Sequence, residues 1–181
     1  TDALANAIDD ERFVLINENF RFIKRFLRFH GVKQVDGILG DFGVSSHQFD
    51  VADRGFSTRF DGALDMRMNQ NDTLSAYEVI NDYEEKELKR VFLDYGELKN
   101  GGAMASVIVA ARAEKKIKNS EELKEVLARF LPGHKANKIL AQIYQAIRIE
   151  VNQEIEVLKE FLIQTEELLV SGGRLSVISY H

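Results

Sequence analysis

The 181-residue chain contains no cysteine, so it can form neither a disulfide framework nor a cysteine-ligated zinc site. This absence fits a reducing cytosol, and we expect a cytoplasmic protein. No apolar run approaches the ~20 residues that a membrane span requires, so no membrane association is expected. The only proline is Pro132, and no stretch is rich in proline, glycine or serine, which argues against a flexible linker between domains.

A formal net charge of −5 argues against a protein that holds nucleic acid mainly by electrostatic attraction. Local basic patches remain compatible with that total. The histidines have no metal-ligand spacing, and no metal site is expected; they are His30, His47, His134 and His181. A hydrophobic content of 45% is enough for a buried core, in one large domain or two small ones.

Both ends of the chain fall within expected secondary structure. Residues 1–6 have the character of the first turns of a helix, and residues 174–181 that of a strand. Natural domains rarely start or stop inside such elements. The chain is therefore expected to be a fragment, or a portion of something longer.

The first part of the chain predicts a parallel sheet. Residues 12–16 are a short β-rich run, and residues 20–30 follow with a helical period of apolar residues that ends at Gly31. Residues 35–41 are then a nearly continuous apolar strand that finishes on Asp41. A strand, a helix and a strand at this spacing indicate a βαβ unit, whose strands are parallel.

The far end of the chain repeats this signature. A helix is expected over residues 152–169, and Gly172 and Gly173 are expected to break it before a strand that begins at Arg174. The two ends of the chain therefore belong to one α/β domain.

Residues 73–149 show almost no strand signal and predict a block of helices. The expected helices cover residues 73–80 with Thr73 as cap, 84–95 with Gly96 as stop, 103–113, 120–130 with Ser120 as cap, and 135–147. An insertion of this length into a parallel α/β domain usually carries substrate recognition. We expect a discontinuous α/β core over residues 1–71 and 150–181 and an inserted helical domain over residues 72–149.

Asp41 is the first candidate for chemistry, because ligands bind beyond the carboxyl ends of the strands in open parallel sheets. A loop of small and polar residues that includes Gln48 follows it. A carboxylate here can accept a hydrogen bond from an amine that is being methylated, and Gln48 can bond a base edge or the amino-acid part of a cofactor. An aspartate after a strand is also a common turn former or cap, and on the residues alone both interpretations stay open.

Residues 54–68 combine large apolar side chains with arginines and have no amphipathic period. A solvated loop does not need the apolar residues, and a core element would not select Arg54, Arg59 and Arg67. A folded loop whose arginines meet phosphate or carboxylate accommodates both sets, because the guanidinium group binds either one through two hydrogen bonds. These three arginines are candidate substrate or RNA contacts.

Several motifs together resemble the signature of a known family. They are Asp41-Phe-Gly-Val-Ser-Ser-His-Gln48, Arg54-Gly-Phe-Ser57, Asp61-Gly-Ala-Leu-Asp-Met-Arg-Met68, Tyr144-Gln-Ala-Ile-Arg-Ile-Glu-Val-Asn152 and Gly172-Gly-Arg-Leu-Ser-Val-Ile-Ser-Tyr-His181. In this order they are similar to the MraW/RsmH family of ribosomal RNA small-subunit methyltransferases. The resemblance covers essentially the whole chain.

The resemblance implies a Rossmann-like class I methyltransferase domain with an inserted helical domain. It implies methyl transfer from S-adenosylmethionine to the N4 amino group of a cytidine in the decoding region of 16S ribosomal RNA, with the small ribosomal subunit as partner. Asp41 and Gln48 match cofactor-contacting positions, and Phe20 matches an aromatic position near the adenine. Asp41 also stands where amino-methyltransferases keep a catalytic Asp or Asn, which implies that it orients the target amine.

The chain departs from the family pattern in three features, one of which is that it stops at His181, before the charged continuation that the family usually has. It lacks the glycine-rich first strand and loop that hold the methionine end of the cofactor, and the acidic residue that holds the ribose. We therefore expect this chain alone to bind S-adenosylmethionine weakly and to be inactive. A non-catalytic binding module, whose helical block docks a ribosomal or protein partner, is the alternative function.

Two further sets of residues have both a functional and a structural interpretation. Lys115, Lys116 and Lys118 lie between expected helices and are candidate RNA contacts, although a solvated charged face is the alternative. Arg148 and Asn152 lie in a matched motif, and they either join the two domains or have a purely structural role.

Overall fold

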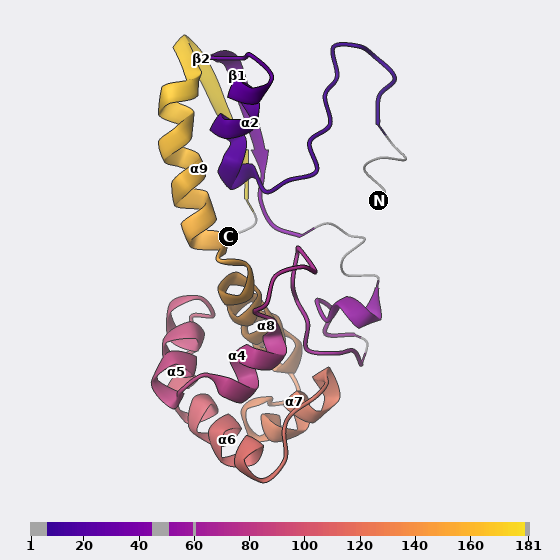
Figure 1. Ribbon diagram of the computed structural model, residues 1–181. Helices are drawn as coiled ribbons and strands as arrows, with labels where there is room; N and C mark the ends of the chain where they lie inside the picture. The colour runs from indigo at the N-terminus through magenta and orange to yellow at the C-terminus, as the bar shows by residue number, and fades with distance from the viewer. Residues whose placement is uncertain (1–6, 45–50, 60, 180–181) are drawn as a thin grey trace. The chain divides into compact units, whose positions relative to one another are not determined.

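A computed structural model describes residues 7–44, 51–59 and 61–179 of the protein (Figure 1). The chain divides into two compact units. The sheet unit comprises Thr1–Phe42 and Ile155–His181, and the helical unit comprises Gly43–Glu154. Each unit has a hydrophobic cluster of its own, so each is described separately.

The sheet unit is built on two parallel strands, β1 (Val35–Asp41) and β2 (Leu169–Ile178). They pair directly with each other, and Asp41 at the end of β1 lies opposite Ile178. Two segments from opposite parts of the chain therefore meet in one parallel sheet, as the sequence predicted. This confirms mixed helix and strand structure with a small parallel sheet.

The glycine pair near the end of the chain has a different role from the one predicted. β2 begins at Leu169 rather than at Arg174. Gly172 and Gly173 therefore lie inside the strand and do not end the helix that precedes it. The pairing moves from Leu169 to Arg174 on β2 while β1 advances by only two residues, from 35 to 37. Gly172 has a φ of +83°, which favours glycine, and the pair permits a bulge in the strand.

Two helices pack beside each other against this sheet. They are α2 (Ile23–Phe29), preceded by the 3-10 turn η1 (Phe20–Phe22), and α9 (Glu154–Leu168). Their apolar side chains surround the buried residues Ile38, Phe161 and Leu168. Arg21 of η1 donates to both carboxylate oxygens of Glu160 on α9, at 2.8 and 2.6 Å. An apolar layer and an ion pair thus join the two helices.

The β-rich run at residues 12–16 is not a strand, contrary to the prediction. It follows a turn in which the Phe13 amide donates to the Asp10 carbonyl at 2.9 Å. Phe13, Val14 and Leu15 are between 37% and 55% exposed. β-Branched and aromatic residues form a strand only where a neighbour bonds their backbone groups. In the part of the chain that the structure describes, β1 and β2 pair only with each other.

The helical unit contains the helices expected for residues 73–149. They are α4 (Ala76–Asp82), α5 (Glu85–Asp94), α6 (Gly101–Glu114), α7 (Ser120–Val126) and α8 (Ala136–Asn152), with the 3-10 turns η2 (Ala52–Arg54) and η3 (Ala128–Phe130). Two caps differ from the prediction. Ser75 rather than Thr73 caps α4, in a capping box with Glu78, and Asn119 rather than Ser120 caps α7. All of these residue types suit a cap, and the backbone conformation selects among them.

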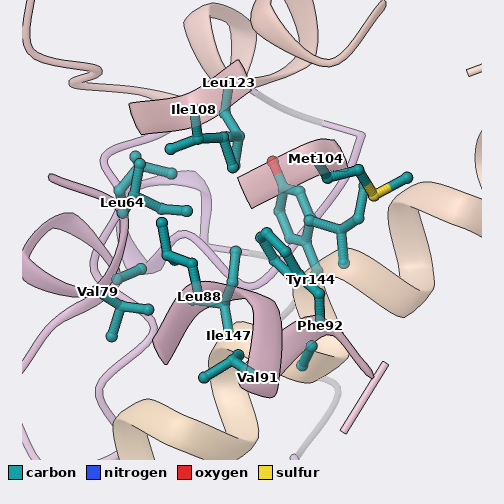
Figure 2. Close-up of a cluster of buried hydrophobic side chains, with 14 of the residues drawn as sticks. Leu64, Val79, Leu88, Val91, Phe92, Met104, Ile108, Leu123, Tyr144 and Ile147 are labelled. Atoms are coloured by element: carbon teal, nitrogen blue, oxygen red, sulfur yellow. The ribbon is translucent and has the colours of Figure 1, made fainter. Parts of the chain in front are cut away.

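One apolar cluster holds the helical unit together (Figure 2). Its buried side chains include Leu64, Val79, Leu88, Val91, Phe92, Met104, Ile108, Leu123, Tyr144 and Ile147. Leu64 and the fully buried Met66 come from the segment before α4. The sequence predicts residues up to 71 as part of the α/β core, whereas this segment packs with the helices. Its functional assignment to the core stays a prediction.

Asn152, at the end of α8, fixes this segment in place. Its Nδ2 donates to the Met66 carbonyl, and its Oδ1 accepts from the Met68 amide, both at 2.7 Å. Met66 has a φ of +58°, a conformation that costs free energy for a residue with a side chain. We call this pair of hydrogen bonds the Asn152 clamp, and it holds Met66 in its strained conformation.

Replacing Asn152 by alanine should lower the free energy of unfolding of the helical unit by about 2–4 kcal/mol. The change leaves the Met66 carbonyl and the Met68 amide without their partner and releases the strained backbone. Urea denaturation followed by circular dichroism measures the effect. Asn137→Ala, at an exposed position in the first turn of the same helix, is the control and should cost under about 0.5 kcal/mol. Equal stability of the two variants would contradict the clamp.

Candidate functional site

Asp41 is the last residue of β1, and its side chain is exposed. Side chains alternate along a strand, so Asp41 shares a face with Leu39, which is 72% exposed, while Ile38 and Gly40 are buried on the other face. Within the described residues, no hydrogen-bond donor contacts the Asp41 carboxylate. The structure thus places an open carboxylate at the edge where a parallel sheet binds ligands.

Three aromatic rings meet at the same end of β1, and we call them the aromatic cluster (Phe20, Phe42 and Phe161). The Phe20 and Phe42 ring centroids are 5.3 Å apart, and both rings meet Phe161 edge-on at 5.4 Å. Phe161 on α9 is 2% exposed, whereas Phe20 is 41% exposed. The buried ring therefore supports a Phe20 ring that stays accessible at the same end of β1 as Asp41.

Gly40 makes room for the aromatic cluster. A Cβ atom at this position would lie 2.9 Å from the Cζ of Phe42 and 3.5 Å from the Cζ of Phe161. A side chain there would displace the Phe42 ring. The sequence prediction included Phe20 but missed Phe42 and Phe161. The glycine directly before Asp41 and Phe42 was the available signal, because glycine inside a strand often marks a close approach.

Arg54, predicted to contact RNA, makes contacts inside the helical unit. Its Nη2 donates to the carbonyls of Arg67 and Met68, at 2.6 and 3.3 Å. Its guanidinium lies 5.7 Å from the centre of the Phe56 ring. The loop is folded around Arg54. This arginine contacts both backbone carbonyls and an aromatic ring of the motif, which explains why charged and apolar residues occur together there.

Arg67 is also bound within the protein. Its Nε and Nη2 donate to the two carboxylate oxygens of Asp65, at 3.0 and 2.8 Å, and its Nη1 donates to the carbonyls of Gln70 and Asp72. Burial alone would raise the pKa of Asp65, but the hydrogen bonds from Arg67 outweigh it and hold that pKa below its usual value. The carboxylate that Arg67 was expected to meet is therefore supplied by its own loop.

Arg59 differs from the other two arginines. It is exposed, and only its backbone amide makes a described hydrogen bond, to Ser57 Oγ at 3.2 Å. No acidic side chain in the described part of the chain pairs with its guanidinium. Of the three predicted arginines, Arg59 is the one whose guanidinium has no described partner within residues 7–44, 51–59 and 61–179, so its charge suits an external anion best.

The predicted lysine run is largely paired with acidic residues. Lys115 contacts Glu122 at 2.5 Å, and Lys116 contacts Asp82 at 2.8 Å. Lys118 is exposed, and its backbone amide donates to the same Glu122 at 2.7 Å. The acidic partners reduce the positive potential that this run presents to RNA.

The remaining predicted residues divide between the two units. Asp41 and Phe20 lie together in the sheet unit, and the arginines and lysines lie in the helical unit. Gln48 lies outside the described residues. A hollow of about 390 Å³ is lined by Arg28, Gly31, Val32 and Lys33. It lies at the turn between α2 and the start of β1, so it is not at the end of the strand where Asp41 stands.

Within residues 7–44, 51–59 and 61–179, no three histidine, cysteine or acidic side chains are grouped so that they could hold a metal ion. None of the helices described over those ranges is both long enough and apolar enough to cross a membrane.

A family model described as the MraW methylase family matches residues 1–181. This chain belongs to the MraW methylase family. The match confirms the resemblance predicted from the motifs.

Curated relatives agree with this assignment to the MraW family. The "Ribosomal RNA small subunit methyltransferase H" of Flavobacterium johnsoniae is 70% identical over 180 residues, which are 99% of this chain and 60% of the relative. Proteins of the same name from Bacteroides thetaiotaomicron and Cytophaga hutchinsonii are 50% and 49% identical over 99% of this chain, and 59% and 61% of their own lengths. The chain thus spans about 60% of the length of these relatives.

In this MraW-family chain, the motif of residues 144–152 makes contacts inside the helical unit. Glu150 accepts from Nη2 of Arg90 through both oxygens at 2.8 Å, and from the Tyr83 hydroxyl at 2.9 Å. Burial and the hydrogen bond to Glu150 raise the pKa of Tyr83 above its ordinary value. Arg148 pairs with Glu154 at 2.7 and 3.1 Å. These contacts give the motif a structural role in joining α8 to its neighbours.

Proposed function

We propose that this MraW-family chain is the larger part of an S-adenosylmethionine-dependent enzyme that methylates the N4 amino group of a cytidine in the decoding region of 16S ribosomal RNA. The observation that supports this most is the exposed Asp41 carboxylate at the carboxyl end of a parallel strand, with the exposed Phe20 ring of the aromatic cluster at the same end of that strand. The names of the relatives support the choice of small-subunit ribosomal RNA. The partner is then the small ribosomal subunit in the bacterial cytoplasm.

The proposal assigns a role to each unit. Two parallel strands with α2 and α9 packed against them are compatible with part of a Rossmann-like class I methyltransferase core. The helical unit, which lies between the two strands in the chain, is then an inserted domain for substrate recognition.

The residues at the Asp41 edge fit S-adenosylmethionine. The Phe20 ring offers a flat apolar surface on which an adenine can stack, and the buried Phe161 ring keeps it in place. The Asp41 carboxylate accepts hydrogen bonds, which the ammonium and hydroxyl groups of the cofactor can donate. When bound, S-adenosylmethionine supplies a methyl group on a positively charged sulfur. Gln48 is a further candidate contact by its place in the motif.

Asp41 has a second task in this proposal. The amino group of cytidine is a poor nucleophile because its lone pair is delocalised into the ring. A hydrogen bond from that amine to Asp41 favours the geometry in which the lone pair leaves the ring system. As positive charge develops on the nitrogen, a fixed carboxylate stabilises the transition state more than the ground state.

Methyl transfer to isolated small subunits tests the proposed function. The full-length protein that carries this chain is incubated with radiolabelled S-adenosylmethionine and bacterial small subunits that lack N4-methylcytidine. Nuclease digestion and mass spectrometry should then find the label as N4-methylcytidine in 16S RNA. Label on a ring carbon or a ribose hydroxyl would contradict the N4 assignment. Binding to the subunit without transfer would favour the non-catalytic binding module.

A further inference from the structure

The turn between η3 and α8 carries positive charge without acidic neighbours in sequence. No aspartate or glutamate occurs between Glu125 and Glu150, although 29 of the 181 residues are acidic. The exposed basic residues in this stretch are Arg129, His134, Lys135 and Lys138. We call these four residues the basic surface. A gap of this length in an acidic protein concentrates positive charge in one place.

Local backbone bonds bring the basic surface together. Arg129 lies in η3, and the Lys135 amide donates to the Pro132 carbonyl at 2.8 Å, which closes a turn into α8. Lys138 follows in the first turn of that helix. The basic surface thus lies within residues 129–138 of the helical unit, from η3 to the first turn of α8.

The charges of the basic surface are not used within the described protein. None of the described carboxylates forms an ion pair with Arg129, Lys135 or Lys138. The run at Lys115 and Lys116 differs, because Glu122 and Asp82 neutralise it. Free cations attract a polyanion more strongly than paired ones, so this surface is better suited to RNA than the predicted lysine run.

The charges of the two lysines are not placed to stabilise the start of α8. Lys135 is the N-cap of the helix, and its side chain makes no capping hydrogen bond. The N-terminal end of a helix carries a positive partial charge, so cations at Lys135 and Lys138 are unfavourable there. The electrostatics of the helix start therefore gives no reason for two lysines at this place.

Arg129 is held in a geometry suited to phosphate and to bases. Its guanidinium lies 4.7 Å from the centre of the Phe130 ring, and Phe130 is half-buried and packed against the core of the helical unit. The aromatic ring keeps the guanidinium plane at the surface. A guanidinium group binds phosphate through two hydrogen bonds and also stacks on unpaired RNA bases.

We propose that the basic surface binds the phosphate backbone of RNA. The inference rests on the proposed function and deepens it, because it names the part of the helical unit that holds small-subunit RNA. Arg129, Lys135 and Lys138 each neutralise one phosphate, and His134 adds a hydrogen-bond donor. The contacts go to the backbone, so they position the RNA and do not read its sequence.

The double variant Lys135→Gln/Lys138→Gln tests this surface in the full-length protein. Its affinity for naked 16S ribosomal RNA, measured by filter binding at about 0.1 M salt, should fall roughly tenfold or more. The slope of log affinity against log salt should become shallower by about 1.4–1.8, since two phosphate contacts are lost. The melting temperature should stay the same or rise, because two unfavourable charges leave the helix start.

Lys86→Gln/Lys89→Gln is the matched control. Both lysines are exposed on α5 of the same unit, and the pair changes the net charge by the same amount. We expect affinity within about twofold of the unchanged protein, since interactions of the exposed α5 charges with RNA bound elsewhere are screened by salt. Equal affinity and equal salt slope in the two double variants would overturn the proposal.

Two further outcomes separate this proposal from others. If the Lys135→Gln/Lys138→Gln variant loses affinity for assembled small subunits but not for naked RNA, the surface binds a ribosomal protein and the proposal is wrong. If the unchanged protein transfers no methyl group but the variants still differ in RNA affinity, the proposed reaction fails while the RNA surface is supported.

Discussion

Replacing Asp41 by alanine should lower the single-turnover rate of methyl transfer by about two to three orders of magnitude, the scale observed when one preorganised electrostatic partner is removed. The carboxylate is exposed at the end of β1 and free to meet a substrate amine. Its interaction strengthens as the amine becomes positively charged, so its loss raises the barrier more than it weakens binding. Rapid-mixing assays on small subunits, at saturating cofactor, measure this rate.

Two companion variants make the Asp41 result specific. Asp41→Asn keeps an acceptor oxygen but removes the charge, so it should retain more activity than Asp41→Ala. Asp36→Ala removes the same charge from an exposed position near the other end of β1, and it should leave the rate within about twofold because it lies far from the reacting edge.

Cofactor binding must be measured on the same variants by calorimetry, because Asp41 is proposed to contact S-adenosylmethionine as well. If Asp41→Ala weakens cofactor binding but has a normal rate at saturation, Asp41 is a binding residue and has no role in orienting the amine.

Replacing Gly55 by alanine should destabilise the helical unit by about 3 kcal/mol or more. Gly55 has a φ of +70°, which is unfavourable for alanine, and an added Cβ would lie 2.3 Å from the Ala63 carbonyl oxygen and 3.0 Å from the Asp65 nitrogen. Backbone atoms cannot rotate away as a side chain does, so the loop must open. That movement also strains the hydrogen bond from the Met66 amide to the Arg54 carbonyl, which is 3.0 Å long.

Urea denaturation of the purified variants gives the size of the Gly55 effect. Gly133→Ala is the control, because an added Cβ there meets no atom within 4 Å and its φ is not in the positive range. It should change the free energy of unfolding by less than about 0.5 kcal/mol, or stabilise the protein slightly by restricting the unfolded chain. Similar stabilities for the two alanine variants would show that the loop adapts to a side chain at position 55.

The sheet illustrates what local sequence can predict. The apolar run at β1 and the run from residue 174 were predicted as strands of one parallel sheet because their residues favour strands and their spacing implies a crossover, and the structure pairs them directly. Residues 12–16 have a similar composition and are not a strand. Pairing depends on which neighbours are present, and that information is not contained in five residues. The bulge at Gly172 was missed for the same reason, because the pairing register depends on the residues of both strands and not on those of β2 alone.

The candidate site was predicted in part. Motif resemblance identified Asp41 and Phe20, but Phe42 and Phe161 come together with Phe20 only through the packing of α9 on the sheet. Gly40 signals a close approach at this place, but the local sequence does not say which distant residue makes it. The motif arginines were expected to meet phosphate or carboxylate, and Arg67 meets Asp65 of its own loop. Their role toward RNA stays a prediction.

The Asn152 clamp also affects how the chain folds. β1 and β2 are separated in the chain by more than a hundred residues, and closing an unfolded loop of that length costs about 4 kcal/mol of chain entropy. The helical unit is one continuous segment whose core forms between helices close in sequence, so it can fold first. Once it does, Asn152 joins the end of α8 to residues 66–68, and most of the loop is already closed. The hydrogen bonds that hold a strained methionine thus shorten the search by which the two strands find each other.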